Sequence, residues 1–118
     1  MKSFIKLPYI FISSLLFSSA LYAEQNNKIK NNLKVISIYQ IDDSSSPGFD
    51  FFTSEKTHKC GGKPSNRYRS YSDYQETNNR KFQLVLAALN NQYPLRIKHL
   101  SCEGRVMLVD YIGISLGS

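Results

Sequence analysis

The first 23 residues constrain the rest of the chain most, because they predict export into an oxidising compartment. Lys2 and Lys6 flank the start of an almost wholly apolar run, LPYIFISSLLF, and small residues follow as far as Ala23. This order is typical of a secretory signal peptide, with cleavage after Ala20 or Ala23. The alternative is a membrane anchor, but the run is shorter than the roughly 20 residues that span a bilayer. We therefore expect a secreted or periplasmic protein.

The expected mature chain contains one pair of cysteines. Cleavage after Ala23 leaves 95 residues (118 − 23), enough for one small domain that would gain noticeably from a covalent link. In an oxidising compartment, Cys60 and Cys102 are expected to form a disulfide. His58 and His99 lie close to the cysteines in the sequence, so a zinc site is the alternative. Because the spacing matches no familiar zinc finger, we expect the disulfide and no metal.

The mature chain is mildly basic. Removal of Lys2 and Lys6 leaves thirteen of the fifteen Lys and Arg residues against nine Asp and Glu, a net charge of +4. These charges are spread along the chain. They suit a weak attraction to anionic sugars or membrane surfaces, and they do not predict nucleic-acid binding.

Five segments have the composition or the alternation of short strands. They are residues 33–41, 49–54, 67–72, 95–100 and 105–116. In the first of these segments, apolar side chains occupy both faces. This pattern predicts that the domain core covers one face and that a helix or a neighbouring subunit covers the other.

The last predicted strand contains one polar residue where its alternation calls for an apolar one. This residue is Asp110, within the segment RVMLVDYIGISL. A half-buried carboxylate with a partner is one explanation, and a β-bulge near Gly113 that turns the side chain outward is the other. We favour the bulge.

One helix separates the third strand from the fourth. The apolar residues with the spacing of one helix face are Phe82, Val85, Leu86 and Leu89. A capping box that begins at Ser72 or Asp73 is expected to start the helix, and Pro94 is expected to end the element. We place the helix at residues 74–91.

The element order β-β-β-α-β-β predicts a mainly β fold with one helix and one disulfide. Five short strands must protect their edges, and an antiparallel five-stranded barrel of the oligomer- or oligosaccharide-binding (OB) type does so. We divide the chain into a signal peptide (1–23), a flexible N-terminal arm (24–32) and an OB-like binding domain (33–118).

The sequence lacks familiar catalytic and cofactor-binding motifs. It has no glycine-rich phosphate loop after a strand and no serine in a G-x-S-x-G turn. Both histidines precede cysteines that we expect to be oxidised, which disfavours a Cys–His nucleophile pair. A small enzyme that uses Asp42, Asp43 or Asp110 is the alternative to the favoured interpretation, a binding protein without a cofactor.

Two segments carry side chains suited to sugar recognition. One is the serine-rich turn that follows residue 41, and the other is residues 67–74 (RYRSYSDY), in which tyrosines alternate with arginines and serines. Aromatic faces can pack on the CH groups of a sugar, and an arginine fork can bind the carboxylate of an acidic sugar. The candidate glycan-binding residues are Asp42, Ser44, Ser45, Arg67, Tyr68, Arg69 and Tyr71.

Residues 35–42 (VISIYQID), 86–97 (LAALNNQYPLRI) and the closing apolar strand at 106–116 form a recognisable set. Together they resemble the binding (B) subunits of AB5 toxins, especially the subtilase-cytotoxin and typhoid-toxin group. The resemblance implies a non-catalytic OB-fold subunit that forms a homopentamer, binds a cell-surface glycan, often sialylated, and delivers a toxic A subunit. A serine that helps to hold sialic acid in that group has no counterpart in residues 29–32. The alternative is a small periplasmic protein that binds or inhibits a protein partner.

Overall fold

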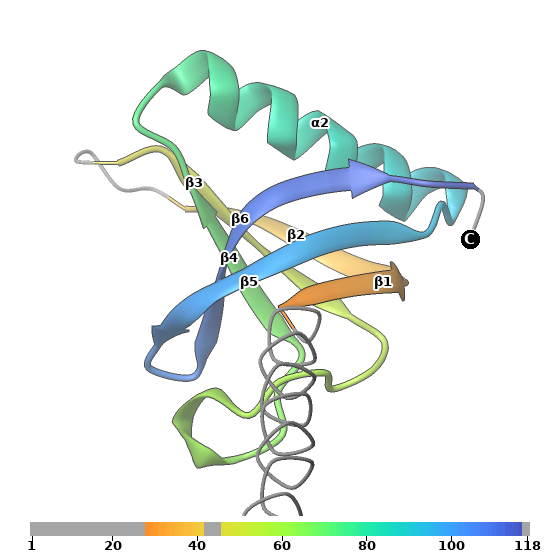
Figure 1. The fold of residues 1–118 in the computed structure, drawn as a ribbon. Coiled ribbons are helices and arrows are strands. Elements are labelled where there is room, and N and C mark those ends of the chain that lie inside the picture. Colours follow the sequence, from red (N-terminus) through yellow and green to blue (C-terminus); the bar gives the residue numbers. More distant parts are fainter. Residues whose placement is uncertain (1–27, 42–45, 117–118) are drawn as a thin grey trace, which may run out of the picture.

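The computed structural model describes residues 28–41 and 46–116 (Figure 1). Along this part of the chain the elements are β1 (Ile29–Leu33), β2 (Val35–Ile41), β3 (Gly48–Thr53), the 3-10 helix η1 (Cys60–Gly62), β4 (Arg67–Tyr71), α2 (Gln75–Asn91), β5 (Leu95–Glu103) and β6 (Val106–Ile114). For these residues, the predicted mainly β fold with one α-helix is confirmed. The predicted signal peptide lies outside the described residues.

The strands form one curved sheet in the order β1-β5-β6-β4-β3-β2. The pairs are antiparallel except for β4 with β6, which is parallel. Two details differ from the expected five-stranded barrel. The sheet has six strands, and it is not closed, because β1 and β2 form its two edges. Only Lys34 separates these two strands along the chain. Strand β2 covers most of the predicted first strand, residues 33–41, whereas β1 is an additional strand that the sequence analysis did not predict.

The N-terminal segment is more ordered than the sequence suggested. Ile29–Leu33 pairs with β5, whereas we expected residues 24–32 to form a flexible arm. Asn32 adopts a left-handed conformation (φ 57°), which asparagine tolerates better than most residues. The polar sequence hid this strand because three of its five residues are Lys or Asn.

A β-bulge explains the apolar residues on both faces of the first predicted strand. Val35 pairs with Thr53 and Ser37 pairs with Phe52, so Ile36 is an extra residue in β2. The side chains therefore change face at this point. Val35 lies in the core, whereas Ile36 and Tyr39 are exposed within the described residues. The apolar residues on both faces of the predicted strand therefore result from a change of register. The expected second cover is missing over Tyr39 among the described residues.

A second bulge accounts for Asp110. Between the pairs Ile97–Ile112 and His99–Val109, β6 contains one residue more than β5. The extra residue turns Asp110 to solvent, where its carboxylate needs no partner. The predicted bulge is therefore confirmed, although it lies slightly earlier in the strand than the expected position near Gly113.

Helix α2 lies across one end of the curved sheet (Figure 1). It begins one residue later than predicted and ends as predicted at Asn91, followed by Gln92 in a left-handed conformation (φ 58°). Its N-cap residue, Tyr74, makes no side-chain capping hydrogen bond, so the expected capping box is wrong. Val85 is buried, as the helix periodicity predicted, and Ala88 is buried as well.

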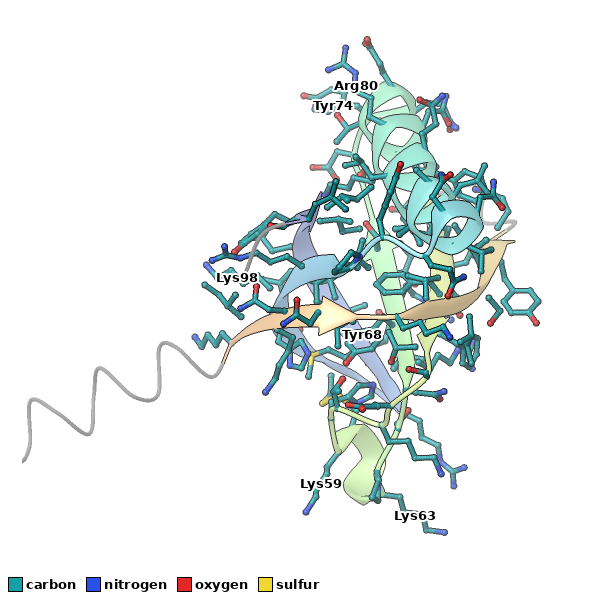
Figure 2. All side chains as sticks on the ribbon, turned by 90° about the vertical axis from the view of Figure 1, so that its right-hand side faces the viewer. Lys59, Lys63, Tyr68, Tyr74, Arg80 and Lys98 are labelled. Atoms are coloured by element: carbon teal, nitrogen blue, oxygen red, sulfur yellow. A yellow bond between two sulfur atoms is a disulfide. The ribbon has the colours of Figure 1, made fainter. Side chains whose placement is uncertain are left out.

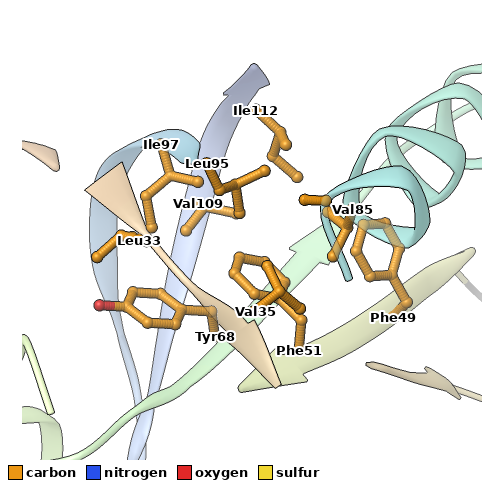
Figure 3. Packing of buried hydrophobic residues seen from close by; sticks show 11 residues of the cluster. Leu33, Val35, Phe49, Phe51, Tyr68, Val85, Leu95, Ile97, Val109 and Ile112 are labelled. Carbon is orange, nitrogen blue, oxygen red and sulfur yellow. The ribbon is translucent and has the colours of Figure 1, made fainter. Parts of the chain in front are cut away.

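The core lies between the concave face of the sheet and α2 (Figure 3). Its buried residues are Leu33, Val35, Phe49, Phe51, Tyr68, Val85, Ala88, Leu95, Ile97, Val109 and Ile112. The edge-to-face contact of Phe49 with Phe82, at 5.4 Å between ring centroids, joins β3 to the helix. The aromatic residues of β3 therefore supply much of the volume that the small sheet encloses.

The predicted disulfide is confirmed. Cys60 and Cys102 are bonded, with 5.4 Å between their Cα atoms, and the bond joins η1 to β5. The zinc alternative is therefore wrong, because both thiols are in the disulfide. The described residues contain no group of three or more His, Cys, Asp or Glu side chains arranged to hold a metal ion. Among the same residues, no helix is long and apolar enough to cross a membrane.

Candidate functional site

The predicted recognition segment lies mainly on β4, and the alternation of that strand divides it between two faces. Tyr68 and Ser70 are buried on the core side. Arg67, Arg69 and Tyr71 are half-buried on the outer side. Because successive side chains of a strand point to opposite faces, these five residues cannot form one surface.

Tyr68 does not belong to a binding surface, so its assignment as a glycan-binding residue is wrong. The side chain is fully buried, and its ring stacks on Phe51 with 5.2 Å between centroids. Its hydroxyl hydrogen bonds with that of Thr57. Burial raises the pKa of the phenol above its usual value. Tyr68 is a core residue whose polar end has a partner.

The two arginines converge on Asp50, which the sequence analysis did not select. Arg67 donates from Nε and Nη2 to Asp50 Oδ2, at 2.9 and 2.7 Å. Arg69 donates from Nε to Oδ1 at 2.6 Å and from Nη2 to Oδ2 at 3.0 Å. The Asp50 side chain is only 5% exposed. One buried carboxylate therefore holds both guanidinium forks.

The remaining donor edge of Arg69 points toward the end of β5. Its Nη1 donates to Glu103 Oε1 at 2.8 Å, and the Tyr71 hydroxyl donates to the same oxygen at 3.0 Å. We call Asp50, Arg67, Arg69 and Glu103 the arginine network. Its two positive and two negative side chains sum to a formal charge of zero. The predicted cationic recognition surface is therefore internally neutralised.

The electrostatics of the network explain why Asp50 stays charged. Burial alone would raise the pKa of Asp50, but the hydrogen bonds and charges of Arg69 and Arg67 outweigh it and lower the pKa. The hydrogen bond to Asp50 is also the main reason why the pKa of Arg69 rises. Each partner therefore favours the ionised form of the other.

A pocket of about 290 Å³ lies where β4 leads into α2. Its lining residues are Tyr71, Ser72, Asp73, Tyr74, Thr77 and Lys81. We call it the β4–α2 pocket. Figure 2 shows Tyr74 at the start of α2, at the opposite end of the molecule from Lys59 and Lys63. Four of the six residues, 71–74, are the last four residues of the predicted recognition segment. The other two, Thr77 and Lys81, come from the first turns of α2.

Gly48 allows Tyr71 to occupy its position. Gly48 pairs with Tyr71 in the sheet, and a Cβ atom at residue 48 would lie 2.9 Å from both the Tyr71 ring and the Ser70 carbonyl oxygen. Any larger residue would have to push this ring or the backbone aside. The glycine thus helps to shape the wall of the β4–α2 pocket.

The structure leaves part of the predicted site undescribed. Asp42, Ser44 and Ser45 lie outside the described residues. The strand ends on either side of them are joined by a hydrogen bond from Gln40 Nε2 to the Gly48 carbonyl oxygen, 2.8 Å long. Of the alternative catalytic aspartates, Asp110 is exposed, and Asp42 and Asp43 are not described.

A group of aromatic and imidazole rings lies on the core side of β4, near the disulfide. We call His58, Tyr68 and His99 the histidine cluster. The Tyr68 ring lies 5.0 Å from the His58 ring and 5.6 Å from the His99 ring, between centroids. His58 Nε2 hydrogen bonds with the Arg67 carbonyl oxygen at 2.8 Å, and its Nδ1 accepts from the Cys60 amide at 3.2 Å. This pattern requires a neutral imidazole.

His99 differs from His58 because its buried Nε2 has no hydrogen-bond partner within the described residues. Burial, followed by the nearby positive charge of Lys30 and by His58, lowers the pKa of His99 to about 4. Burial also lowers the pKa of His58. Both rings are therefore neutral near pH 7, and the cluster has a structural character.

Some of the site could have been found from the sequence. Asp50 is the one acidic residue in an otherwise aromatic and apolar strand, GFDFFT, and two arginines occupy alternate positions in a later strand. That combination was a signal for a cross-strand ion pair. Thr77 and Lys81 gave no such signal, because only the turn between β4 and α2 brings them beside Tyr71.

No protein-family model and no curated protein matches this chain.

Proposed function

We propose that this chain is a secreted, non-catalytic glycan-binding protein and that the β4–α2 pocket is its sugar site. The observation that carries the proposal is the composition of this pocket, which combines two tyrosines with hydroxyl, carboxylate and ammonium groups. Sugar sites need an aromatic face for the CH groups and both donors and acceptors for the hydroxyls. The pocket volume is close to the lower limit for small-molecule sites, which suits the terminal residue of a glycan.

Three residues of the pocket have a defined task in this proposal. The Tyr74 side chain is 73% exposed and offers an aromatic face. Asp73 accepts hydrogen bonds, whereas Lys81 donates them. Lys81 Nζ already donates to the Asp110 carbonyl oxygen at 3.0 Å, which holds the ammonium against β6. A partly preordered lysine loses less conformational entropy when a ligand binds.

The resemblance to AB5 binding subunits supports further proposals about assembly. We propose a homopentamer that carries a toxic A subunit to a cell surface, with the signal peptide directing export. The exposed Ile36 and Tyr39 on β2 leave apolar surface for contacts between copies. The oligomeric state follows from the mass of the native protein in solution.

The proposed function is tested by glycan-array binding of the mature, disulfide-bonded protein. We expect at least one class of cell-surface glycan to bind, and we expect Tyr74→Ala to weaken that binding about tenfold or more through loss of the aromatic face. Tyr111→Ala is the matched control, because it removes another exposed tyrosine, on β6, that belongs neither to the pocket nor to the proposed contact surface on β2. A folded wild-type protein that binds no glycan would contradict the proposal.

The second candidate function is binding or inhibition of a protein partner in the periplasm. It is favoured by Ile36 and Tyr39, which are exposed on the edge strand β2, and by Phe52, which is half-buried on the neighbouring strand β3. The rings of Tyr39 and Phe52 are in edge-to-face contact at 5.7 Å, and the outer edge of β2 has no partner strand in the described chain. Tyr39→Ala and Tyr74→Ala distinguish this candidate, because Tyr39→Ala would then impair partner capture from a periplasmic extract and Tyr74→Ala would not.

A further inference from the structure

We infer that Tyr39, Phe52 and Arg67 form a docking surface for a protein partner, on which Arg67 binds an acidic side chain and the two rings contact an apolar one. We call these three residues the β2–β4 surface. The inference rests on the second candidate function, protein binding, and makes the class of partner narrower. The surface contains the first residue of β4, whereas the β4–α2 pocket begins at the last, Tyr71.

The three side chains of the β2–β4 surface are neighbours on adjacent strands. Phe52 of β3 pairs with Arg67 of β4 in the register of the sheet. The guanidinium carbon of Arg67 lies 5.9 Å from the centroid of the Phe52 ring, and the Tyr39 ring lies 5.7 Å from the same ring. Tyr39 is 59% exposed, and the Arg67 side chain is 43% exposed. The two rings and the guanidinium group therefore form one continuous, accessible surface.

Asp50 binds only one side of the Arg67 guanidinium group. Nε and one N–H of Nη2 donate to Asp50 Oδ2, at 2.9 and 2.7 Å. Nη1 and the second N–H of Nη2 have no partner among the described residues. These N–H groups form the pair that can bind a carboxylate through two parallel hydrogen bonds. Because Asp50 and the Phe52 ring hold the guanidinium group, Arg67 loses little conformational entropy when such a ligand binds.

Arg69 provides no comparable pair of donors, so the acidic group is assigned to Arg67. All three nitrogens of the Arg69 guanidinium group donate within the protein, to Asp50, Glu103 and Tyr71. The arginine network as a whole sums to zero and exerts no long-range attraction on an anion. Selection of an acidic group therefore depends on direct contact with the free N–H pair of Arg67.

The composition of the β2–β4 surface favours a protein over an acidic sugar. A sugar site needs several donors and acceptors aimed at hydroxyl groups, whereas this surface offers two rings, one guanidinium group and a single hydroxyl. Tyrosine and arginine are the residue types that often dominate the energy of protein–protein binding.

The edge of the sheet beside Tyr39 also favours a protein. Strand β2, VISIYQI, contains no charged residue and no proline, which are the residues that commonly protect a sheet edge from pairing. Its outer edge has no partner strand in the described chain. The backbone of a partner can pair with such an edge, and a sugar cannot.

The inference is tested by selection of peptides from a phage-displayed random library on the mature, disulfide-bonded protein. We expect the enriched peptides to carry Asp or Glu close to an aromatic or aliphatic residue. Arg67→Gln should weaken their binding about tenfold or more, because two charged hydrogen bonds are lost. Tyr39→Ala should weaken it as well, through loss of an aromatic contact. A set of enriched peptides without acidic residues would overturn the inference.

A double-mutant cycle shows whether the acidic residue of the peptide contacts Arg67 itself. Replacement of that residue by its amide should weaken binding to the wild-type protein about tenfold or more, and it should have little effect on binding to Arg67→Gln. Titration calorimetry measures the four affinities. Equal losses in the two proteins would place the acidic residue away from Arg67 and would contradict its assigned role.

Arg80→Gln is the matched control. Arg80 is an exposed arginine on α2 with one carboxylate partner, Glu76, and its replacement changes the net charge by the same amount as Arg67→Gln. We expect peptide binding to be unchanged in this variant. An equal loss in both variants would show that overall charge matters rather than the free N–H pair, and the inference would then be wrong.

Arg67→Lys is the second variant if Arg67→Gln does not fold. Lysine keeps a positive charge beside Asp50, but it has no second planar pair of N–H groups. We expect it to show the same loss of peptide binding as Arg67→Gln. Full affinity in a folded Arg67→Lys protein would exclude binding through two parallel hydrogen bonds.

Further outcomes separate the inference from the proposed functions. Peptide binding that needs Tyr39 but not Arg67 would support protein binding and overturn the role of Arg67. If no peptide is enriched on the folded protein, the inference fails, whether or not glycans bind. If Arg67-dependent peptide binding is found but no glycan binds, the glycan proposal fails and the inference stands. Arg67-dependent binding of an acidic glycan without peptide binding would overturn the choice of a protein partner.

Discussion

The two faces of β4 bring ionisable side chains together under opposite conditions. On the outer face, Asp50 and Glu103 each accept charged hydrogen bonds from arginine. On the inner face, the histidine cluster contacts aromatic rings and backbone groups. The ionisable groups whose charge acts on His99 are Lys30 and His58, neither of which is acidic. Strand β4 thus separates the arginine network, whose charged side chains form ion pairs, from the histidine cluster, whose side chains are neutral and form no ion pair among the described residues.

The comparison shows how burial and pairing decide the state of an ionisable group. Desolvation penalises the charged form on both faces. On the outer face, two guanidinium groups offset that penalty, so the carboxylate remains ionised. On the inner face, the hydrogen bond of His58 to the Arg67 carbonyl oxygen offsets only part of the penalty, and His99 has no offsetting contact among the described residues. Both imidazoles therefore lose their protons more readily. The identity of the neighbours therefore matters more than the depth of burial.

The largest change in the free energy of unfolding is expected on removal of the Cys60–Cys102 disulfide, which lies near the histidine cluster on the inner face. Replacement of both Cys60 and Cys102 by alanine should destabilise the domain by about 4 kcal/mol, because the bond closes a long loop in the unfolded chain. Chemical denaturation of the oxidised protein and of the variant measures the difference. An unchanged free energy of unfolding would mean that the loop around η1 is held by its other contacts, His58 included.

The next effect tests the pairing on the outer face. Asp50→Ala should cost about 3 kcal/mol, because it leaves two partly buried arginines without their shared partner. Glu103→Ala should cost less than about 1 kcal/mol, because that side chain is 47% exposed and its ion pair is screened by water. Denaturation midpoints with a constant m-value measure both. Equal costs would show that burial does not govern the strength of the network.

The smallest expected effect is a pH-dependent loss of stability, which occurs in a different pH range for each face of β4. Because the pKa of His99 falls from 6.5 to about 4 on folding, the associated stability is complete above pH 6.5 and is lost as the pH falls toward 4. We expect a loss of roughly 2–3 kcal/mol, since the ring retains some access to water. The stability that depends on ionised Asp50 is instead lost below its ordinary pKa of 3.8.

Urea denaturation at intervals between pH 7 and pH 3 measures these two windows. His99→Gln should flatten the dependence between pH 6.5 and 4 and leave the part below pH 4 in place. Asp50→Asn should do the reverse. If His99→Gln retains the full loss between pH 6.5 and 4, another group is responsible, and His58 is the next to test.

Much of the fold could be predicted from local patterns. The alternation of β5 and the apolar stripe of α2 correctly placed Leu95, Ile97 and Val85 in the core. The pattern failed at β1, where Lys and Asn residues concealed a strand that only pairing with β5 stabilises. It also failed at Ile36, because a bulge reverses the faces of a strand without a sequence signal strong enough to locate it.

The candidate site was less predictable than the fold. The segment 67–74 was correctly singled out as unusual, but its composition could not show that Tyr68 is in the core while Tyr71 lines a pocket. Strand alternation alone allows either tyrosine to point outward. The choice depends on Phe51, whose ring stacks on Tyr68 from the neighbouring strand.

The amino-acid sequence by itself determined the order of the helix and of the five strands β2 to β6, the position of the helix and the pairing of the two cysteines. These features depend on the periodicity of nearby residues and on the number of thiols. The tertiary structure alone decided that Asp50 binds both arginines, that β1 is a strand and that His99 lies unpaired. Those outcomes depend on which residues of distant segments face each other across the sheet, and local periodicity carries no information about that registration.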